Sequence, residues 1–294
     1  MGIQTALIRE GERLEELNGP SLVILQKKKA FHYGTDAVLL ADFAQPRPRE
    51  QMVDLGTGTG VIALLAVSHQ VNVRCTAVEI QPDMADMAAR SVLLNGLEEQ
   101  ISVLCEDFRQ AHRVLGCEKY TLAVCNPPYG KAGGTLRSER ETERIARHEG
   151  DCTIEDVCLS AFRLLRTGGR FAVVFPAPRM LELMCAMRNA RLEPKRVRTV
   201  HHRAGDAPKL VLVEAIKGGG SMLHWLPPLI LQSDDGAPTA EYLRIYQAEP
   251  GGGAAGRQGR RPLAAADSGD EFGNHQLEFP NSAFVNISVR PAPA

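Results

Sequence analysis

Short apolar runs alternate with stretches of helical spacing over most of the chain. The runs whose length and composition suit buried strands are Met52–Leu55, Val73–Ile80, Ile101–Leu104, Tyr120–Cys125, Phe171–Phe175 and Leu210–Ile216. Between them, the spacing of apolar residues predicts helices over residues 61–67, 84–94, 154–165 and 179–189. Strands that alternate with helices indicate a mostly parallel sheet with helices on both faces. The pattern therefore predicts an α/β fold.

The first 49 residues carry a weaker pattern, which we interpret as an N-terminal extension. Leu22–Leu25 is its apolar strand candidate, and the basic run Lys27–Lys29 follows. Thr35 is a residue type that caps helices, so a short helix is predicted to begin there and to end before Pro46. Residues 50–247 then form the main predicted domain.

The character of the chain changes after residue 247. Residues 248–294 are rich in Gly, Ala, Pro and Arg and show no sustained period. Such a composition buries too little apolar surface to offset the entropy of ordering. We therefore expect a disordered tail, in which only Leu277–Phe279 and Phe284–Val289 are apolar.

The composition is that of an ordinary globular protein. Of the 294 residues, 44% are hydrophobic and 23% are charged, and the formal net charge is −1. Any contact with nucleic acid therefore requires a local basic patch. The chain has no run of the ~20 apolar residues that a membrane span needs, and its first residues lack the pattern of a secretory signal. We expect a cytoplasmic protein with no membrane partner, and a monomer is favoured.

The seven cysteines form no C-x-x-C pair, and several lie in apolar runs. Reduced core residues explain them better than a disulfide framework or a metal site, so no metal ligand is predicted. Trp225 is also expected to pack against the protein.

Two basic zones offer a local patch. Residues 188–203 contain six Lys and Arg residues and only one acid, Glu193, which fits phosphate contacts. Residues 131–147 alternate in charge and form either a loop that clamps RNA or a solvated helix face. Arg147 ends that zone, and His148 after it either contacts a ligand or anchors a helix.

A glycine-rich turn joins the first strand of the main domain to its helix. Gly56, Gly58 and Gly60 lack a β-carbon, so the backbone can turn tightly and approach a ligand. In open α/β sheets, ligands bind at the carboxyl ends of the strands. A dinucleotide fingerprint would have glycine at position 61, where this chain has Val61, which disfavours a nicotinamide cofactor.

Three acidic residues lie at or near the strand ends beside this turn. Glu79 closes the second strand of the domain, where a carboxylate suits the two hydroxyls of a ribose. Asp54 is placed to orient the glycine loop or to bind an ammonium group of the ligand. Asp107, after the third strand, is placed to meet an adenine amino group. These positions predict a cofactor that contains adenosine.

The run Asn126-Pro127-Pro128-Tyr129 follows the fourth strand and indicates chemistry on an amino group. An amino group conjugated to a base or an amide is a poor nucleophile, because its lone pair is in resonance. The Asn126 side-chain oxygen and the Pro127 carbonyl can accept its two hydrogens, which turns the lone pair toward a methyl donor. The successive prolines stiffen the turn, and Tyr129 offers a ring for stacking. No general base is required, because the amine becomes acidic only after methylation.

Together these residues resemble the class I methyltransferases that modify amino groups of adenine, cytosine or glutamine. Within them, the chain resembles the bacterial tRNA1(Val) (adenine(37)-N6)-methyltransferase family over roughly residues 15–247. The matching segments are FHYGTDAVLLA (31–41), DLGTGTG (54–60), NPPY (126–129) and ARHE (146–149). The resemblance implies a seven-stranded Rossmann-like fold, S-adenosyl-L-methionine as methyl donor and tRNA as substrate. It also implies that Tyr33, Thr35 and Asp36 lie near the cofactor pocket.

Three other functions remain open at this point. A glutamine N5-methyltransferase that acts on release factors uses the same NPPY chemistry, but that family has a helical substrate-binding domain where this chain has residues 1–49. A DNA adenine methyltransferase usually needs a large target-recognition region. A non-catalytic cofactor-binding RNA module is disfavoured by intact Asn126 and Tyr129. The favoured hypothesis is N6 methylation of an unpaired adenine in a tRNA anticodon loop, because an unstacked loop base costs little to extract.

Overall fold

The computed structural model describes residues 7–17, 22–27, 34–70, 72–127 and 152–247. These residues belong to one compact unit, Met1–Gly252. The predicted tail and the basic zone at 131–147 lie outside the described residues, so the predicted domain limits and the two interpretations of that zone stay predictions.

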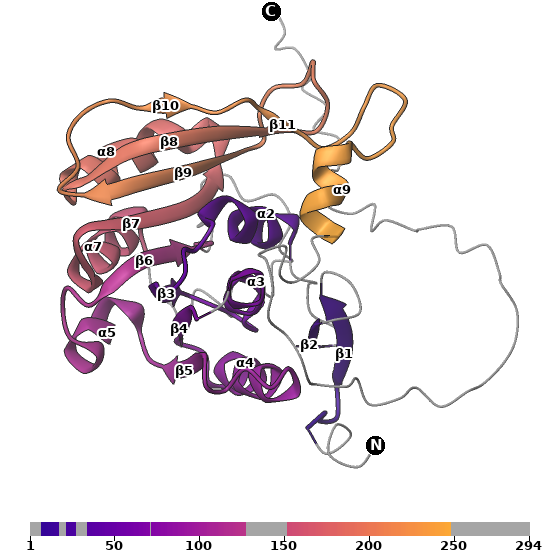
Figure 1. Cartoon of the computed structure of the whole chain (residues 1–294), viewed down its shortest axis with the longest axis vertical. Helices are drawn as coiled ribbons and strands as arrows, with labels where there is room; N and C mark the ends of the chain where they lie inside the picture. The colour runs from indigo at the N-terminus through magenta and orange to yellow at the C-terminus, as the bar shows by residue number, and fades with distance from the viewer. Residues whose placement is uncertain (1–6, 18–21, 28–33, 71, 128–151, 248–294) are drawn as a thin grey trace, which may run out of the picture. The chain divides into compact units, whose positions relative to one another are not determined.

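A nine-stranded sheet forms the centre of the unit (Figure 1). Its strands are β3 (Gln51–Leu55), β4 (Arg74–Glu79), β5 (Ile101–Cys105), β6 (Tyr120–Cys125), β7 (Leu165–Pro176), β8 (Leu192–His201), β9 (Leu210–Lys217), β10 (His224–Trp225) and β11 (Leu229–Ile230). The order is β10-β8-β9-β7-β6-β3-β4-β5, and β11 also pairs with β8. Only β9 runs antiparallel to its neighbours among these pairings. The predicted seven-stranded, mostly parallel sheet is confirmed, and the two-residue strands β10 and β11 extend it.

Helices cover both faces of the sheet, as predicted (Figure 1). One face carries α2 (Thr35–Ala44), α3 (Val61–His69) and α4 (Pro82–Leu94), whose apolar residues share one core cluster. The other face carries α5 (Phe108–Leu115), α7 (Ile154–Leu164) and α8 (Met180–Asn189), which follows the 3-10 turn η1 (Ala177–Arg179). A further helix, α9 (Ala240–Gln247), contacts α2.

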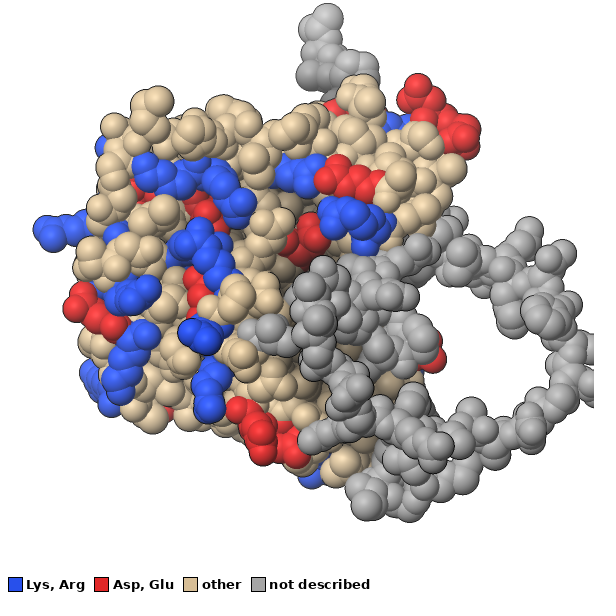
Figure 2. Space-filling model, viewed as in Figure 1, with Lys and Arg blue, Asp and Glu red and all other residues tan. Residues whose placement is uncertain are grey.

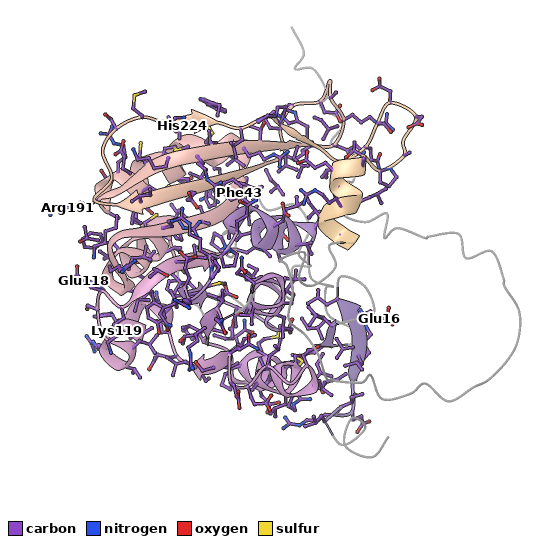
Figure 3. All side chains as sticks on the ribbon, viewed as in Figure 1. Glu16, Phe43, Glu118, Lys119, Arg191 and His224 are labelled. Carbon is purple, nitrogen blue, oxygen red and sulfur yellow. The ribbon has the colours of Figure 1, made fainter. Side chains whose placement is uncertain are left out.

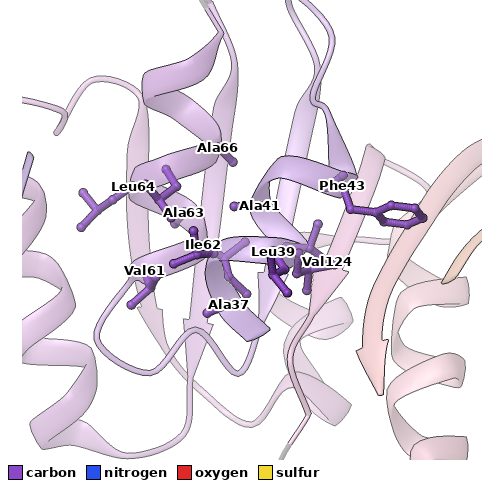
Figure 4. Close-up of a cluster of buried hydrophobic side chains, with 14 of the residues drawn as sticks. Ala37, Leu39, Ala41, Phe43, Val61, Ile62, Ala63, Leu64, Ala66 and Val124 are labelled. Carbon is purple, nitrogen blue, oxygen red and sulfur yellow. The ribbon is translucent and has the colours of Figure 1, made fainter. Parts of the chain in front are cut away.

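Small side chains let α2 pack closely on α3 (Figure 4). Ala37 and Ala41 of α2 face a run of α3 that includes Ala63, and all three are nearly inaccessible to solvent. Figure 4 also shows Ala37, in the first turn of α2, at the same end as Val61, the first residue of α3. The amino-terminal end of α2 therefore lies beside the end of α3 that follows the glycine loop.

An N-terminal hairpin packs on α4. Its strands, β1 (Glu12–Leu17) and β2 (Leu22–Lys27), pair antiparallel. Side chains of α4 and of its C-cap residue satisfy amides of β2: the Leu25 amide donates to Ser91 Oγ at 3.0 Å, and the Val23 amide donates to Oδ1 of the C-cap Asn95 at 2.9 Å. The guanidinium of Arg90 also pairs with the Glu12 carboxylate at 2.6 Å.

Several details differ from the sequence predictions. Gly34, not Thr35, is the N-cap of α2, and Thr35 is its first helical residue. Trp225 does not pack against the protein, because 61% of it is exposed on the edge strand β10. Cys75, Cys125 and Cys158 are buried as expected, but the core assignment is wrong for the exposed Cys105, Cys117 and Cys185.

The basic zone at 188–203 is largely β8, and most of its cations have partners within the protein. Arg196 pairs with Glu214, Arg198 with Glu241, and Arg188 with Glu193. Lys195 donates to backbone carbonyls of residues 220–222. These four residues thus have partners within the protein, whereas Arg191 is exposed, and the predicted phosphate contacts of this zone stay a prediction.

Candidate active site

The carboxyl ends of four neighbouring strands bring most of the predicted site residues to one edge of the sheet. Leu55 at the end of β3 pairs with Val78 of β4 on one side and with Cys125 of β6 on the other. Gly56, which follows Leu55, therefore lies next to Asn126, which follows Cys125. On the other side, Glu79 pairs with Cys105 at the end of β5. This edge joins the glycine loop, the acidic residue of β4 and the start of the NPPY run.

The glycine loop turns away from β3 by way of left-handed backbone conformations. The φ angles of Gly56, Gly58 and Gly60 are 73°, 60° and 97°, a region that residues with a β-carbon rarely adopt. The Gly56 and Thr57 amides both donate to the Val78 carbonyl, at 2.9 and 3.0 Å. A β-carbon at Gly56 or Gly58 would have no protein atom within 4 Å. The loop backbone therefore borders open space that a ligand can approach.

Glu79 is buried at the end of β4 and holds the glycine loop. Its Oε2 atom accepts from the Gly58 amide at 2.8 Å, and Oε1 accepts from the Gln81 amide at 2.9 Å. Burial raises the pKa of this carboxyl, and the amide hydrogen bonds oppose that rise. Each carboxylate oxygen can accept more than one hydrogen bond, so both retain capacity for hydroxyl donors.

Asp54 is fully buried beneath the same loop. The Thr57 hydroxyl donates to its Oδ2 atom at 2.6 Å, which links the carboxylate to the loop. Its Oδ1 atom has no hydrogen-bond partner in the described part of the chain. Burial raises the pKa of Asp54 to about 7, and the charge of Glu79 contributes in the same direction. Asp54 therefore anchors the glycine loop from beneath, and its ionised form places a negative charge under the loop backbone.

Asp107 has a structural role that the sequence analysis missed, because α5 was not predicted. It is the N-cap of α5, and its Oδ1 atom accepts from the Arg109 amide at 2.9 Å. The Arg109 guanidinium also pairs with its carboxylate at 2.7 Å. Its position after β5 beside Glu79 is as predicted, but part of its hydrogen-bonding capacity serves the helix.

Only the first half of the NPPY run lies within the described residues. Asn126 is half-buried and Pro127 is buried at the end of β6. The Cys125 thiol donates to the Leu55 carbonyl at 3.1 Å, which fixes the strand end beside the glycine loop. Pro128, Tyr129, Tyr33, Arg147 and His148 lie outside the described residues.

Thr35 and Asp36 occupy the first turn of α2, at the end that lies beside the start of α3. Asp36 Oδ1 accepts from the Ala37 amide at 2.9 Å. Thr35 Oγ1 lies 3.1 Å from the hydroxyl of Tyr246 on α9. Tyr246 was not among the predicted site residues, because a contact across 211 residues leaves no local pattern in the sequence.

A second contact that the sequence analysis missed comes from the hairpin. Gln26 Nε2 donates to Thr59 Oγ1 at 2.8 Å, and both side chains are buried. Thr59 lies between Gly58 and Gly60, so the carboxyl end of β2 is hydrogen-bonded to the glycine loop. Neither residue type indicates this contact, because both are common in loops and at strand ends.

The described residues contain no group of three or more His, Cys, Asp and Glu side chains arranged to hold a metal ion. None of the helices in those same ranges is long and apolar enough to cross a membrane.

Comparison with known families agrees with this geometry. Residues 27–190 match the family described as the methyltransferase small domain. The chain is 30% identical over 226 residues to the tRNA1(Val) (adenine(37)-N6)-methyltransferase of Porphyromonas gingivalis, which covers 74% of this chain and 88% of the relative. It is 28% identical over 217 residues to the protein of the same name from Aeromonas hydrophila, with 74% and 89% covered.

Solved structures of methyltransferases share the fold. A predicted O-methyltransferase from Agrobacterium tumefaciens has a TM-score of 0.61 at 24% identity, covering 73% of this chain and 97% of that one. TYW2 from P. horikoshii, in complex with MeSAdo, has a TM-score of 0.50 at 14% identity, with 72% and 73% covered. At these identities the likeness shows the fold alone.

Proposed function

The chain belongs to the methyltransferase small domain family and, within it, to the tRNA1(Val) (adenine(37)-N6)-methyltransferases, and we propose how its residues perform the reaction. It is an N6-adenine methyltransferase, and we assign its substrate as an unpaired adenine in a tRNA anticodon loop. The observation that carries the assignment of residues is the pairing of Leu55 with Cys125, which sets the glycine loop beside Asn126. A cytoplasmic location, which goes with such a substrate, stays a prediction.

The cofactor we propose is S-adenosyl-L-methionine, whose sulfonium supplies an electrophilic methyl group when it is bound. The buried polar groups fit it: Glu79 accepts from the ribose hydroxyls, and the ionised Asp54 carboxylate beneath the glycine loop attracts the ammonium group. The Asp107 carboxylate, which also accepts hydrogen bonds from Arg109, accepts one from the adenine amino group. The positive φ angles of Gly56, Gly58 and Gly60 keep β-carbons away from the ligand.

Asn126 and Pro127 hold the amino group that is methylated. The Asn126 side-chain oxygen and the Pro127 carbonyl accept the two amino hydrogens, which directs the nitrogen lone pair toward the donor. In this proposal Pro128 stiffens the turn and Tyr129 stacks on the adenine. Tyr33, Thr35 and Asp36 border the cofactor pocket, with Thr35 held by Tyr246. The proton on the methylated nitrogen then leaves to solvent, so no side chain acts as a general base.

Methyl transfer from labelled S-adenosylmethionine tests the substrate. The full-length protein is given total tRNA in one reaction and release factor protein in another. Label recovered from tRNA as N6-methyladenosine after nuclease digestion is the expected result. Label in protein alone would assign the glutamine N5 activity instead. Tight cofactor binding with no label in either substrate would favour the non-catalytic RNA module.

A further inference from the structure

The amino ends of the parallel strands carry a group of basic side chains, which we call the amino-edge band. Because parallel strands start at one edge of a sheet, the residues that lead into β3, β4, β6, β7 and β8 share the edge opposite the glycine loop. The band consists of the exposed residues Arg47, Arg49, Arg74, Lys119, Arg166 and Arg191. Figure 3 shows Lys119 and Arg191 along one side of the molecule, and Figure 2 shows Lys and Arg side chains gathered on that side.

The acids at this edge do not neutralise the band. The Glu50 carboxylate is buried against Arg170 at 2.7 Å, and Glu118 pairs with the buried ammonium of Lys217 at 2.8 Å. Across the ranges that the structure describes, no ion pair involves a side chain of the band. The band ends at β5, which Glu98 and Glu99 precede. Its charge is therefore free to act on a partner.

Two arginines of the band have positive φ angles, a backbone conformation that glycine and asparagine adopt more readily than arginine does. The φ angles of Arg49 and Arg191 are 67° and 58°, in the left-handed region that glycine and asparagine tolerate best. Both side chains are exposed, so packing does not explain an arginine at either position. Because sparsely populated backbone conformations cluster at ligand sites, the two arginines are candidates for a binding role.

We propose that the amino-edge band binds the phosphate backbone of a structured RNA, at a surface separate from the active site. From β8 to β4 the band crosses five strand spacings of about 4.8 Å, or roughly 24 Å. Because a duplex carries about one negative charge per 1.7 Å of its axis, this length spans several phosphates. Contacts of this kind position RNA without reading its sequence. Taking the RNA to be tRNA rests on the proposed function, and the band then contacts the part of tRNA outside the target loop.

The test uses substitutions that remove the positive charge and introduce residues that tolerate a positive φ angle. In the full-length protein, Arg49→Gly and Arg191→Asn are combined, and binding of total tRNA is measured over a range of salt concentrations. Loss of two phosphate contacts should weaken binding about tenfold and reduce the slope of log K against log salt by about 1.4–1.8. The thermal midpoint should not fall, and S-adenosylhomocysteine binding should stay unchanged.

Gln45→Gly is the matched control. Gln45 has a φ angle of 40° on the same edge, so this variant relaxes the backbone without changing the charge. Its tRNA affinity should equal that of the wild type. Unchanged tRNA affinity and salt slope in the double variant would overturn the band proposal, as would an equal loss in Gln45→Gly. If the wild type binds tRNA but transfers no methyl group to it, the proposed function is wrong. The band proposal is then still decided by the tRNA affinity and salt slope of the double variant.

Discussion

The Oε2 atom of Glu79 accepts a 2.8 Å hydrogen bond from the backbone amide of Gly58, so the end of β4 sets the shape of the loop that follows β3. The other oxygen is engaged by the Gln81 amide. A carboxylate at this position therefore both shapes the cofactor loop and, in our proposal, binds the ribose.

Glu79→Gln should weaken S-adenosylhomocysteine binding about tenfold or more. Glutamine offers one acceptor oxygen where two amides need one each, and a lost hydrogen bond to a buried charged group costs about 1.5–3 kcal/mol. Calorimetric titration checks the affinity. Glu106→Gln is the control, because the Glu106 carboxylate accepts from the adjacent Asp107 amide, a bond that a glutamine oxygen can replace. Equal affinities in Glu79→Gln and the wild type would contradict the assigned role.

Asp54 should make stability depend on pH. Burial raises its pKa to about 7 in the folded protein, whereas an unfolded chain ionises near pH 4. Between these values the folded state binds a proton that the unfolded state lacks. The free energy of unfolding should therefore fall as pH rises from about 4 to about 7, and this contribution should be constant above pH 7. Urea unfolding across this range should show a smaller pH-dependent fall for Asp54→Asn than for the wild type.

The same group should couple cofactor affinity to pH. If an ammonium group of the cofactor faces Asp54, binding favours the ionised carboxylate and releases a proton. S-adenosylhomocysteine affinity should then rise between pH 6 and pH 7.5 in the wild type, and less in Asp54→Asn. An identical rise in both proteins would show that another group is responsible.

Sequence patterns predicted the fold where each element has a strong local signal. Tyr120–Cys125 is an apolar run that became β6 with the predicted bounds, and Glu79 lies at its predicted strand end. The pattern failed for β8 because its surface positions are Lys and Arg, whose partners Glu214 and Glu241 come from distant segments. Helix α5 was missed because its eight residues, FRQAHRVL, bury only Ala111. Contacts such as Gln26 with Thr59 depend on tertiary packing and leave no periodic trace.

Asn126→Ala should lower kcat for methyl transfer by about a hundredfold or more, because an acceptor that orients the reacting nitrogen is lost. S-adenosylhomocysteine affinity should stay within about twofold of the wild type, since a lost substrate contact leaves the cofactor's partners in place. Steady-state kinetics and calorimetry measure the two effects separately. Loss of both together would mean that Asn126 serves the cofactor pocket and does not act on the substrate.

Two substitutions of Asp107 can distinguish its role as a helix cap from a role in cofactor binding. Asp107→Ala should destabilise the protein by about 1 kcal/mol through loss of the N-cap of α5. Asp107→Ser retains a capping oxygen and should restore most of that stability. If the carboxylate also meets the adenine amino group, both variants should bind S-adenosylhomocysteine more weakly than the wild type. Normal affinity in Asp107→Ser would limit Asp107 to its structural role.

Gln26 should affect the cofactor through the hairpin. Its side chain donates to Thr59 inside the glycine loop, so Gln26→Ala removes a buried partner and lets that loop move. We expect S-adenosylhomocysteine affinity to fall several-fold. A double-mutant cycle with Thr59→Ala should give a coupling energy of about 1 kcal/mol.

The matched control for Gln26 is Asn95→Ala, which removes the contacts of Asn95 with Val23 and leaves the glycine loop untouched. Both variants should lower the thermal midpoint, because both weaken the attachment of the hairpin. Only Gln26→Ala should weaken cofactor binding beyond what the loss of stability explains. If the two variants change cofactor affinity equally, the hairpin acts as a structural support, and the contact between Gln26 and Thr59 has no separate effect on the cofactor site.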